Sequence, residues 1–497
     1  MRRKIATGLL ALLTVLPACG QSRNFQIGQW MDIQNSILKE LNQYYVDTLP
    51  VEKMKRAAID AMLQQLDPYT VYVPEEETED FNFQINKVYG GIGAVIYKRE
   101  GEPVYINEPY TGSPCLKSGM ESGDQILKID GTDTTPLDAQ ACSNMMKGTP
   151  GSEVEFLVKK VHSSDTLLVK VKREKIHLPD IEYCGMLDAE TGYILQSGFT
   201  EGVGSQVRDC VTALKRRGMK KLIYDLRGNG GGLMMEAVEI VSVFVPKGSL
   251  VVSSKGRGGK TVQSYHTSKD PVDVNLPLVV LVDGGSASAS EIVSGALQDL
   301  DRATIMGTRT FGKGLVQSIR PVPYGGQLKV TVAKYYTPSG RCVQAIDYSN
   351  RKPDGSVGHI PDSLTHEFKT LKGRTVRDGG GITPDIEIPY TMPDEIVYSL
   401  VLGGIVNNYA LHYKLNHPSI APASEFEFIE FEDFVEYARP LLKEESQGKL
   451  DSLDWKQLKP FVEEEIIVRY YQQAAGVECQ MRYDEQLKEA LKQTPVV

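Results

Sequence analysis

The chain has 497 residues, 41% of them hydrophobic and 24% charged, which is enough for about three globular domains with ordinary cores. Its formal net charge of -9 argues against nucleic acid or an anionic membrane surface as the main partner, because both attract basic faces. We therefore expect a multidomain globular protein that binds no nucleic acid.

The N-terminus has the layout of a secretory signal over residues 1–19. A positive start at residues 2–4 precedes an apolar run at 5–16 that is too short to span a bilayer. Residues 16–19 also resemble a bacterial lipoprotein cleavage box, which would place a lipid on Cys19. Cleavage nearby by the ordinary signal peptidase is the alternative. Under both interpretations the protein is exported to the cell envelope. We expect a periplasmic protein that is anchored to the membrane by a lipid on Cys19.

Helical periodicity dominates the region that we assign to residues 24–76. Ile33, Ile37 and Leu41 fall on one helix face, and a second apolar face follows around Met54 to Leu66. Asp67 precedes a proline and is expected to end the second helix.

Residues 87–175 change in character and predict a compact β-rich module with two helices. A glycine-rich loop precedes a strand, and alternating apolar residues mark the later strands. The predicted strands are 94–97, 125–129, 153–160 and 166–172, and the predicted helices begin at Ser113-Pro114 and Pro136.

Strands and helices alternate over residues 177–390, which predicts an α/β core. The expected strands are 222–226, 277–282, 303–306 and 327–336, with a helix over 291–300. Residues 347–378 are polar and are expected to form an irregular excursion. Residues 391–497 are acidic and helical, for example at 431–439 and 461–473.

Three serines, Ser286, Ser288 and Ser290, lie among tiny residues between a buried strand and an amphipathic helix. Helix capping explains such serines, and Ser288 with Glu291 fits a capping pattern. A serine at the head of a helix after a strand can also be a nucleophile, because the helix dipole favours its alkoxide.

Lys313 lies between Gly312 and Gly314, and Gln317 follows four residues later. A surface lysine is the ordinary interpretation. The flanking glycines let the backbone pass close to another strand, where desolvation would lower the pKa of the amine enough for it to act as a base. Gln317 would share a strand face with it and hold the amine in line.

A glycine-rich turn at residues 228–232 follows the buried strand that ends near Asp225. Such turns often aim backbone N–H groups at an anion, although many are tight turns without chemistry. Together with the serine and the lysine, this turn would form an oxyanion site.

These motifs make the chain resemble the carboxyl-terminal processing, or tail-specific, serine peptidases. The segments that carry the resemblance are 66–70, 89–93, 225–227 with 231–232, 285–291, 309–314 and 335–340. The resemblance implies that Ser288 is the nucleophile, Lys313 the base at the spacing the family requires, and Gln317 its partner. It also implies an oxyanion hole from the N–H groups of Ala289 and Gly231, with Gly232 as the alternative.

The resemblance further implies that residues 87–175 form a PDZ domain and residues 177–390 the protease core. The loop of Gly90, Gly91, Ile92 and Gly93 would bind the terminal carboxylate of a protein tail, and the next strand edge would accept the peptide by β-addition. The implied function is an exported serine endopeptidase that works through a Ser-Lys dyad and an acyl-enzyme. A homodimer formed through the terminal helices is a further prediction.

Two rival functions remain. One is a non-catalytic PDZ scaffold of the envelope. The other is a Ser-His-Asp hydrolase, but the sequence lacks the nucleophile elbow and the well-placed histidine that such an enzyme needs.

His359 and His366 flank Asp362 in a weak metal pattern, and we expect no metal and no cofactor. Six cysteines besides Cys19 permit disulfides or buried free thiols.

Overall fold

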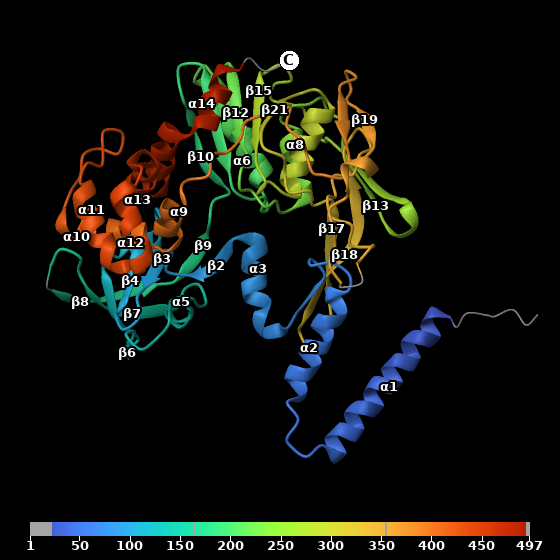
Figure 1. The fold of residues 1–497 in the computed structure, drawn as a ribbon, viewed down its shortest axis with the longest axis horizontal. Coiled ribbons are helices and arrows are strands. Elements are labelled where there is room, and N and C mark those ends of the chain that lie inside the picture. Colours follow the sequence, from blue (N-terminus) through green and yellow to red (C-terminus); the bar gives the residue numbers. More distant parts are fainter. Residues whose placement is uncertain (1–21, 164, 353–354, 494–497) are drawn as a thin grey trace, which may run out of the picture. The chain divides into compact units, whose positions relative to one another are not determined.

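The computed structural model describes residues 22–163, 165–352 and 355–493 (Figure 1). They divide into two compact units, one that ends at Leu66 and one that begins at Asp67. The predicted signal and the lipid site at Cys19 lie outside the described residues.

The first unit consists of two helices, as predicted. Helix α1 (Arg23–Tyr44) is capped by Ser22, whose hydroxyl accepts the N–H of Phe25 at 3.2 Å, and helix α2 (Val51–Gln64) follows. No residue of α1 is buried, and its apolar side chains are exposed, Trp30 at 68%.

The helical region ends earlier than the predicted limit of residue 76. Strand β1 (Val71–Val73) pairs with β18 (Gln327–Tyr336), so this part of the chain belongs to a sheet of the second unit. The alternating, β-branched residues of β1 favour such an edge position. A short 3₁₀ turn, η1 (Glu75–Glu77), and helix α3 (Thr78–Asn86) then lead to the β-rich module.

The β-rich module is a PDZ fold with its own apolar core. Its strands run in the order β3-β4-β5-β7-β8, with β6 beside β5, and a separate ribbon pairs β2 with β9. Buried residues on one face of this sheet, such as Ile106, Ile126 and Phe156, make one cluster. The elements are β2 (Val88–Gly91), β3 (Ala94–Lys98), β4 (Val104–Pro109), α4 (Pro114–Lys117), β5 (Gln125–Ile129), β6 (Thr132–Asp133), α5 (Ala139–Met146), β7 (Glu153–Lys159), β8 (Thr166–Lys172) and β9 (Glu174–His177).

The α/β core is built on a six-stranded sheet in the order β10-β11-β12-β15-β16-β21, parallel except for the β10–β11 pair. Every residue of β15 is buried, as expected for a parallel strand that is covered on both faces. The elements are β10 (Ile181–Met186), β11 (Thr191–Gln196), α6 (Val203–Arg216), β12 (Lys221–Asp225), α7 (Met234–Val241), β15 (Leu278–Val282), α8 (Ala289–Asp299), β16 (Thr304–Gly307) and β21 (Ile386–Glu387).

The two faces of this sheet are covered by different helices. Leu222, Tyr224 and Val280 pack with the apolar side chains of α6, α7 and α8. The alternate residues Ile223 and Val279 pack instead against α14 (Glu485–Lys492), near the end of the chain. The helical C-terminal region therefore contributes directly to the core of the α/β domain.

A second sheet carries the strand that follows Lys313. It contains β1-β18-β13-β14, and β17 (Leu315–Pro321) pairs antiparallel with β18. The remaining strands are β13 (Leu250–Lys255) and β14 (Thr261–His266), with the 3₁₀ turn η2 (Arg257–Gly259) between them. The excursion predicted over 347–378 contains one small hairpin, β19 (Glu367–Lys369) and β20 (Thr375–Arg377).

The C-terminal helices form a separate apolar cluster around Tyr409 and Phe434. They are α9 (Glu395–Leu402), α10 (Ile405–Asn416), α11 (Phe431–Ala438), α12 (Glu444–Gln447) and α13 (Trp455–Tyr483), in addition to α14. None of the helices in the described part of the chain is both long enough and apolar enough to cross a membrane.

Candidate functional site

Ser288 occupies a strained position at the start of α8. It has φ 56° and ψ -110°, a region that residues other than glycine rarely adopt, and such strain costs on the order of 1–3 kcal/mol. The phenol of Tyr335 donates to the Ser288 carbonyl at 3.1 Å and helps to hold this turn. Backbone strain of this kind is characteristic of functional sites, where the surrounding structure maintains it.

The three serines of the motif have different environments. The hydroxyl of Ser286 donates to the carbonyl of Leu226, and that of Ser290 to the carbonyl of Asn229, each at 2.8 Å. Both are fully buried, whereas Ser288 is partly exposed and lines a cavity. The flanking serines therefore tie the turn to the glycine-rich loop, and Ser288 alone of the three faces open space.

Glu291 connects the serine turn to the lysine segment. Its buried carboxylate accepts the N–H groups of Ser288 at 2.9 Å, Gly312 at 2.7 Å and Lys313 at 2.8 Å, and the hydroxyl of Thr310 at 2.6 Å. Burial raises the pKa of Glu291, and these four hydrogen bonds oppose that rise. The sequence indicated Glu291 only as a partner in a helix cap.

The side chain of Lys313 is mostly buried and therefore partly desolvated. Its Nζ lies 4.6 Å from the centroid of the Tyr69 ring. Burial, with a smaller contribution from the cation of Lys329, lowers the pKa of Lys313 to about 8, although Glu291 and Asp67 act in the opposite direction. An amine with such a pKa is neutral in a minor but significant fraction near physiological pH, and that fraction can accept a proton.

Gln317 lies on β17, on the strand that Lys313 leads into. Its amide donates to the hydroxyl of Thr331 at 3.2 Å, and that hydroxyl donates to Asp67 at 3.1 Å. Asp67 also accepts the N–H groups of Tyr69 and Thr70, both at 2.9 Å. This chain of contacts orients Gln317 and fixes the Tyr69 ring beside the lysine.

One cavity of about 520 Å³ brings the predicted residues together. Ser288, Lys313, Gln317 and the glycines 230–232 all line it, with apolar walls from α3 and β17. Within the described structure no hydrogen bond joins Lys313 Nζ to the Ser288 or Gln317 side chain, because the amine stands over the Tyr69 ring. Ser288 and Lys313, the residues of the predicted dyad, share a cavity without a direct contact in this arrangement.

The predicted oxyanion donors lie against the nucleophile. A Cβ placed on Gly231 would lie 2.8 Å from both Ser288 Cβ and Ala289 N, so only glycine fits there. The N–H of Gly231 donates to the Asn229 side chain at 2.9 Å, and its use by an oxyanion would require that bond to exchange. Gly232 lies in a short parallel bridge with Phe199.

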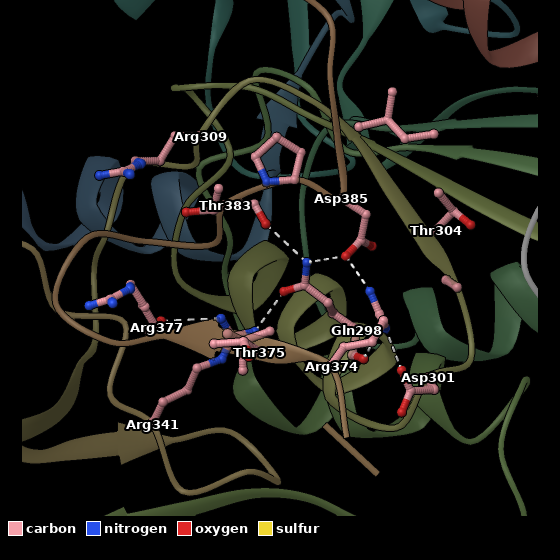
Figure 2. A pocket seen from close by; sticks show the side chains of 14 residues that line it. Gln298, Asp301, Thr304, Arg309, Arg341, Arg374, Thr375, Arg377, Thr383 and Asp385 are labelled. Atoms are coloured by element: carbon pink, nitrogen blue, oxygen red, sulfur yellow. Dashed lines mark hydrogen bonds and ion pairs between the residues drawn. The ribbon is translucent and has the colours of Figure 1, made fainter. Parts of the chain in front are cut away.

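A second cavity, of about 650 Å³, is lined by four arginines near the C-terminal end of α8 (Figure 2). Arg341 pairs with Asp299 at 2.8 Å and Arg374 with Asp301 at 2.6 Å, and Gln298 bonds to both arginines through its side chain and carbonyl. The ion pairs of Arg341 and Arg374 therefore stabilise the fold, and Ser288, Lys313 and Gln317 do not line this cavity.

The predicted carboxylate-binding loop is shorter than expected. Gly90 and Gly91 pair with β9, so only Ile92 and Gly93 form the bend before β3. The Ile92 side chain is buried in the module, and the Ile92 and Gly93 carbonyls accept bonds from the N–H groups of residues 115 and 110, both at 2.9 Å. Strand β3 is at the end of the strand order, which leaves it as an edge.

The remaining sequence candidates lie apart from this cavity. His366 pairs with Asp378 at 3.3 Å, and no group of three or more metal-ligating side chains occurs among the described residues. The six cysteines between residues 115 and 479 are free thiols in this structure.

Four residues of the site were not predicted as functional: Asp67, Tyr69, Glu291 and Tyr335. Each lies inside a segment that carried the family resemblance. That was the only signal available, because their contacts with the lysine and serine join distant parts of the chain.

Comparisons with known proteins identify two families of domain in this chain. A sequence model described as Peptidase family S41 matches residues 190–357, and one described as PDZ domain matches residues 75–159. The first range contains Ser288, Lys313 and Gln317, and the second contains the loop at 90–93.

Two curated relatives show the extent of the similarity. The chain is 33% identical over 314 residues to a carboxy-terminal-processing protease of Bartonella bacilliformis, covering 62% of this chain and 71% of that protein. It is 34% identical over 325 residues to a probable CtpA-like serine protease of Staphylococcus aureus, covering 65% of this chain. It spans 64% of the length of that relative. Among solved structures, a photosystem II D1 C-terminal processing protease matches with a TM-score of 0.40 and 26% identity, over 72% of this chain and 86% of the other.

Proposed function

This chain belongs to the carboxy-terminal-processing serine peptidases of family S41, and on that premise we propose that it is an endopeptidase with Ser288 as nucleophile and Lys313 as base. One observation carries the proposal: Glu291 fixes the backbones of both residues while their side chains line one cavity. A scaffold without activity would have no use for a desolvated lysine beside a strained serine.

The reaction begins when the Lys313 amine leaves the Tyr69 ring and approaches Ser288 Oγ. The neutral amine takes the hydroxyl proton, and Oγ attacks the carbonyl carbon of the scissile peptide. Lys313 then gives its proton to the leaving amine, which departs and leaves an acyl-enzyme on Ser288. Lys313 next removes a proton from water, and the hydroxide attacks the acyl carbon. The ester bond to Ser288 Oγ then breaks, and Lys313 returns the proton to Oγ, which restores the serine and the neutral amine. Gln317 guides the amine through its side-chain oxygen, since its NH₂ group is held by Thr331.

The negative charge of the tetrahedral intermediate needs two donors. Ala289 N–H, at the first turn of α8, is one, and the helix dipole supports it. Gly231 N–H is the other, after it releases the side chain of Asn229. We expect a small backbone rotation to turn this N–H toward the oxyanion, because a Cβ built on Gly231 would lie 2.8 Å from Ser288 Cβ.

Substrate delivery is assigned to the PDZ module, within limits that we propose as 87–175, with the core at 177–390 and the helical region at 391–497. The edge of β3 would take a protein tail as an added strand, with the bend at Ile92 and Gly93 near its terminal carboxylate. Export, lipid attachment at Cys19 and a homodimer through terminal helices belong to the same proposal and rest on the sequence alone.

The test compares the purified wild-type chain with Ser288→Ala and Lys313→Ala on a protein substrate that ends in an apolar tail. We expect both variants to lose cleavage by at least about 10³-fold, as removal of a nucleophile or its base does, while circular dichroism stays unchanged. Lys334→Ala, on an exposed position of β18, serves as the lysine control. Cleavage that persists in both variants would overturn the proposal, and an acyl-trapping probe that labels Ser288 would separate an enzyme from a scaffold.

A further inference from the structure

A second lysine lies on the strand face that lines the catalytic cavity. Lys329 and Thr331 of β18 lie opposite Ile319 and Gln317 of β17, so these two side chains share a strand face. A register shift of the β17–β18 pair separates them from Tyr335, which lines the same cavity as Lys329. Tyr335 touches the Ser288 carbonyl, and Thr331 holds Gln317. Lys329 continues this row, roughly 7 Å beyond Thr331 along the strand.

Three lysines line the cavity, and within the described residues Lys329 differs from Lys87 in having no carboxylate partner. Lys87 pairs with Asp180 at 3.0 Å. Lys329 is half-buried, lies opposite Ile319 of β17, and forms no ion pair or hydrogen bond of its side chain within the described residues. Burial lowers the pKa of Lys329, as expected for an ammonium held beside apolar walls without a counter-charge.

We propose that Lys329 is a specificity residue that binds a carboxylate of the polypeptide lying in the catalytic cavity. The inference rests on the proposed function and adds a substrate preference to it. An N⁺–H···O⁻ contact would supply the missing counter-charge, and such contacts are about twice as strong as neutral hydrogen bonds. The carboxylate comes from an acidic side chain near the scissile bond or from the terminus of a short tail.

The geometry favours a residue close to the scissile bond. An extended peptide rises about 3.3 Å per residue, so the distance from Thr331 to Lys329 corresponds to about two residues of substrate. Gln317 bonds to Thr331, and Lys329 is close enough to Lys313 to lower its pKa, which places the carboxylate within a few residues of the bond that is cleaved.

The experiment uses the full chain and a set of alanine- and leucine-rich peptides, each with one Glu moved stepwise across the cleaved bond, and matched Gln peptides. Every peptide is made with a free and with an amidated C-terminus. We expect wild type to prefer Glu over Gln at one position by about 10-fold in kcat/KM, which corresponds to about 1.4 kcal/mol. A preference that disappears on amidation assigns the carboxylate to the peptide terminus, and one that survives assigns it to the side chain.

The lysine is tested by Lys329→Met and by the charge reversal Lys329→Glu. We expect the first to bring the Glu/Gln ratio to about one and the second to favour a Lys peptide at the same position. Lys334→Met is the matched control, because Lys334 of the same strand is exposed, does not line the cavity and should leave the preference unchanged.

A binding measurement keeps the test independent of catalysis. Fluorescein-labelled Glu and Gln peptides are titrated with the Ser288→Ala protein, with and without Lys329→Met. The same discrimination in affinity supports the proposal even if no peptide is cleaved, in which case only the proposed function fails. Equal affinity of Ser288→Ala for every Glu and Gln pair, or a preference that Lys329→Met retains, overturns the assignment of Lys329 while serine-dependent cleavage can still stand.

Discussion

The backbone N–H groups of Ser288 and Lys313 donate to the same oxygen of one buried carboxylate, at 2.9 and 2.8 Å. Glu291 thereby fixes the nucleophile segment and the base segment relative to each other, although they come from different sheets. The proposed mechanism requires the Lys313 amine to move within the cavity. A fixed backbone frame with a mobile amine explains how the residues can be apart here and still form a dyad.

The first prediction concerns this frame. Glu291→Gln replaces one acceptor oxygen by an NH₂ group that faces N–H donors, so we expect kcat to fall at least about 100-fold with a smaller change in KM. The free energy of unfolding should fall by roughly 2–4 kcal/mol, because buried donors lose their partner. Steady-state kinetics and urea unfolding measure the two effects. Glu201→Gln, at an exposed turn, is the control. A variant with normal kcat would show that Glu291 does not position the dyad.

The pH dependence follows from the lowered pKa of Lys313. Only the neutral amine can act as base, so kcat/KM should rise about tenfold per pH unit below pH 8 and level off above it. Lys329→Met should move the midpoint to higher pH, since it removes a cation that lowers the pKa of Lys313. A pH profile from 6 to 10 on a neutral peptide decides both points. A flat profile across this range would argue against Lys313 as the base.

The same shift predicts that the lysine destabilises the fold. The pKa of Lys313 is about 8 when folded and near its ordinary 10.5 when unfolded, so the folded state disfavours the charged form. The cost is full below pH 8 and disappears as the pH rises through 10.5. We expect Lys313→Met to raise the free energy of unfolding by roughly 1–3 kcal/mol at pH 7, with a smaller gain at pH 10. Urea unfolding at the two pH values measures this. A variant that is less stable than wild type at pH 7 would show that the amine is well solvated in the fold.

The sequence predicted the strands and helices that carry the motifs because their signals are local. Strand β18 was predicted with its observed limits, and α8 was predicted within two residues of its start. The contacts of Glu291 with residues 312 and 313, and of Asp67 with Thr331, were not predictable. They join segments far apart in the chain, and neither periodicity nor capping patterns specify such a partner.

The C-terminal region was also predicted only in part. Its helical character was clear, but amphipathic periodicity shows that a helix has an apolar face without showing what covers that face. In the structure, α14 covers the face of the central sheet opposite to α6, α7 and α8, and Leu487 packs there with Ile223 and Val279. Part of residues 391–497, which the sequence described only as acidic and helical, is therefore packed into the protease core.

The last prediction tests whether this packing matters for catalysis. Arg227, at the start of the loop that carries Gly231, donates to Asp484 at 3.1 Å and to Gln486 at 2.9 Å. Asp484 also caps α14 by accepting the N–H of Leu487 at 2.8 Å. Asp484→Asn preserves the cap and removes one of the two carboxylate charges that hold Arg227, the other being that of Asp225.

Because the loop would then position Gly231 less firmly for the oxyanion, we expect kcat to fall about 10-fold while KM changes little. The pair is largely buried, so the free energy of unfolding should fall by about 1–3 kcal/mol. The control is Asp454→Asn, which alters the equivalent cap of α13, where Asp454 accepts the N–H of Lys456 at 3.0 Å and does not contact Arg227. Equal kcat in the two variants would mean that α14 supports the fold without positioning the oxyanion loop.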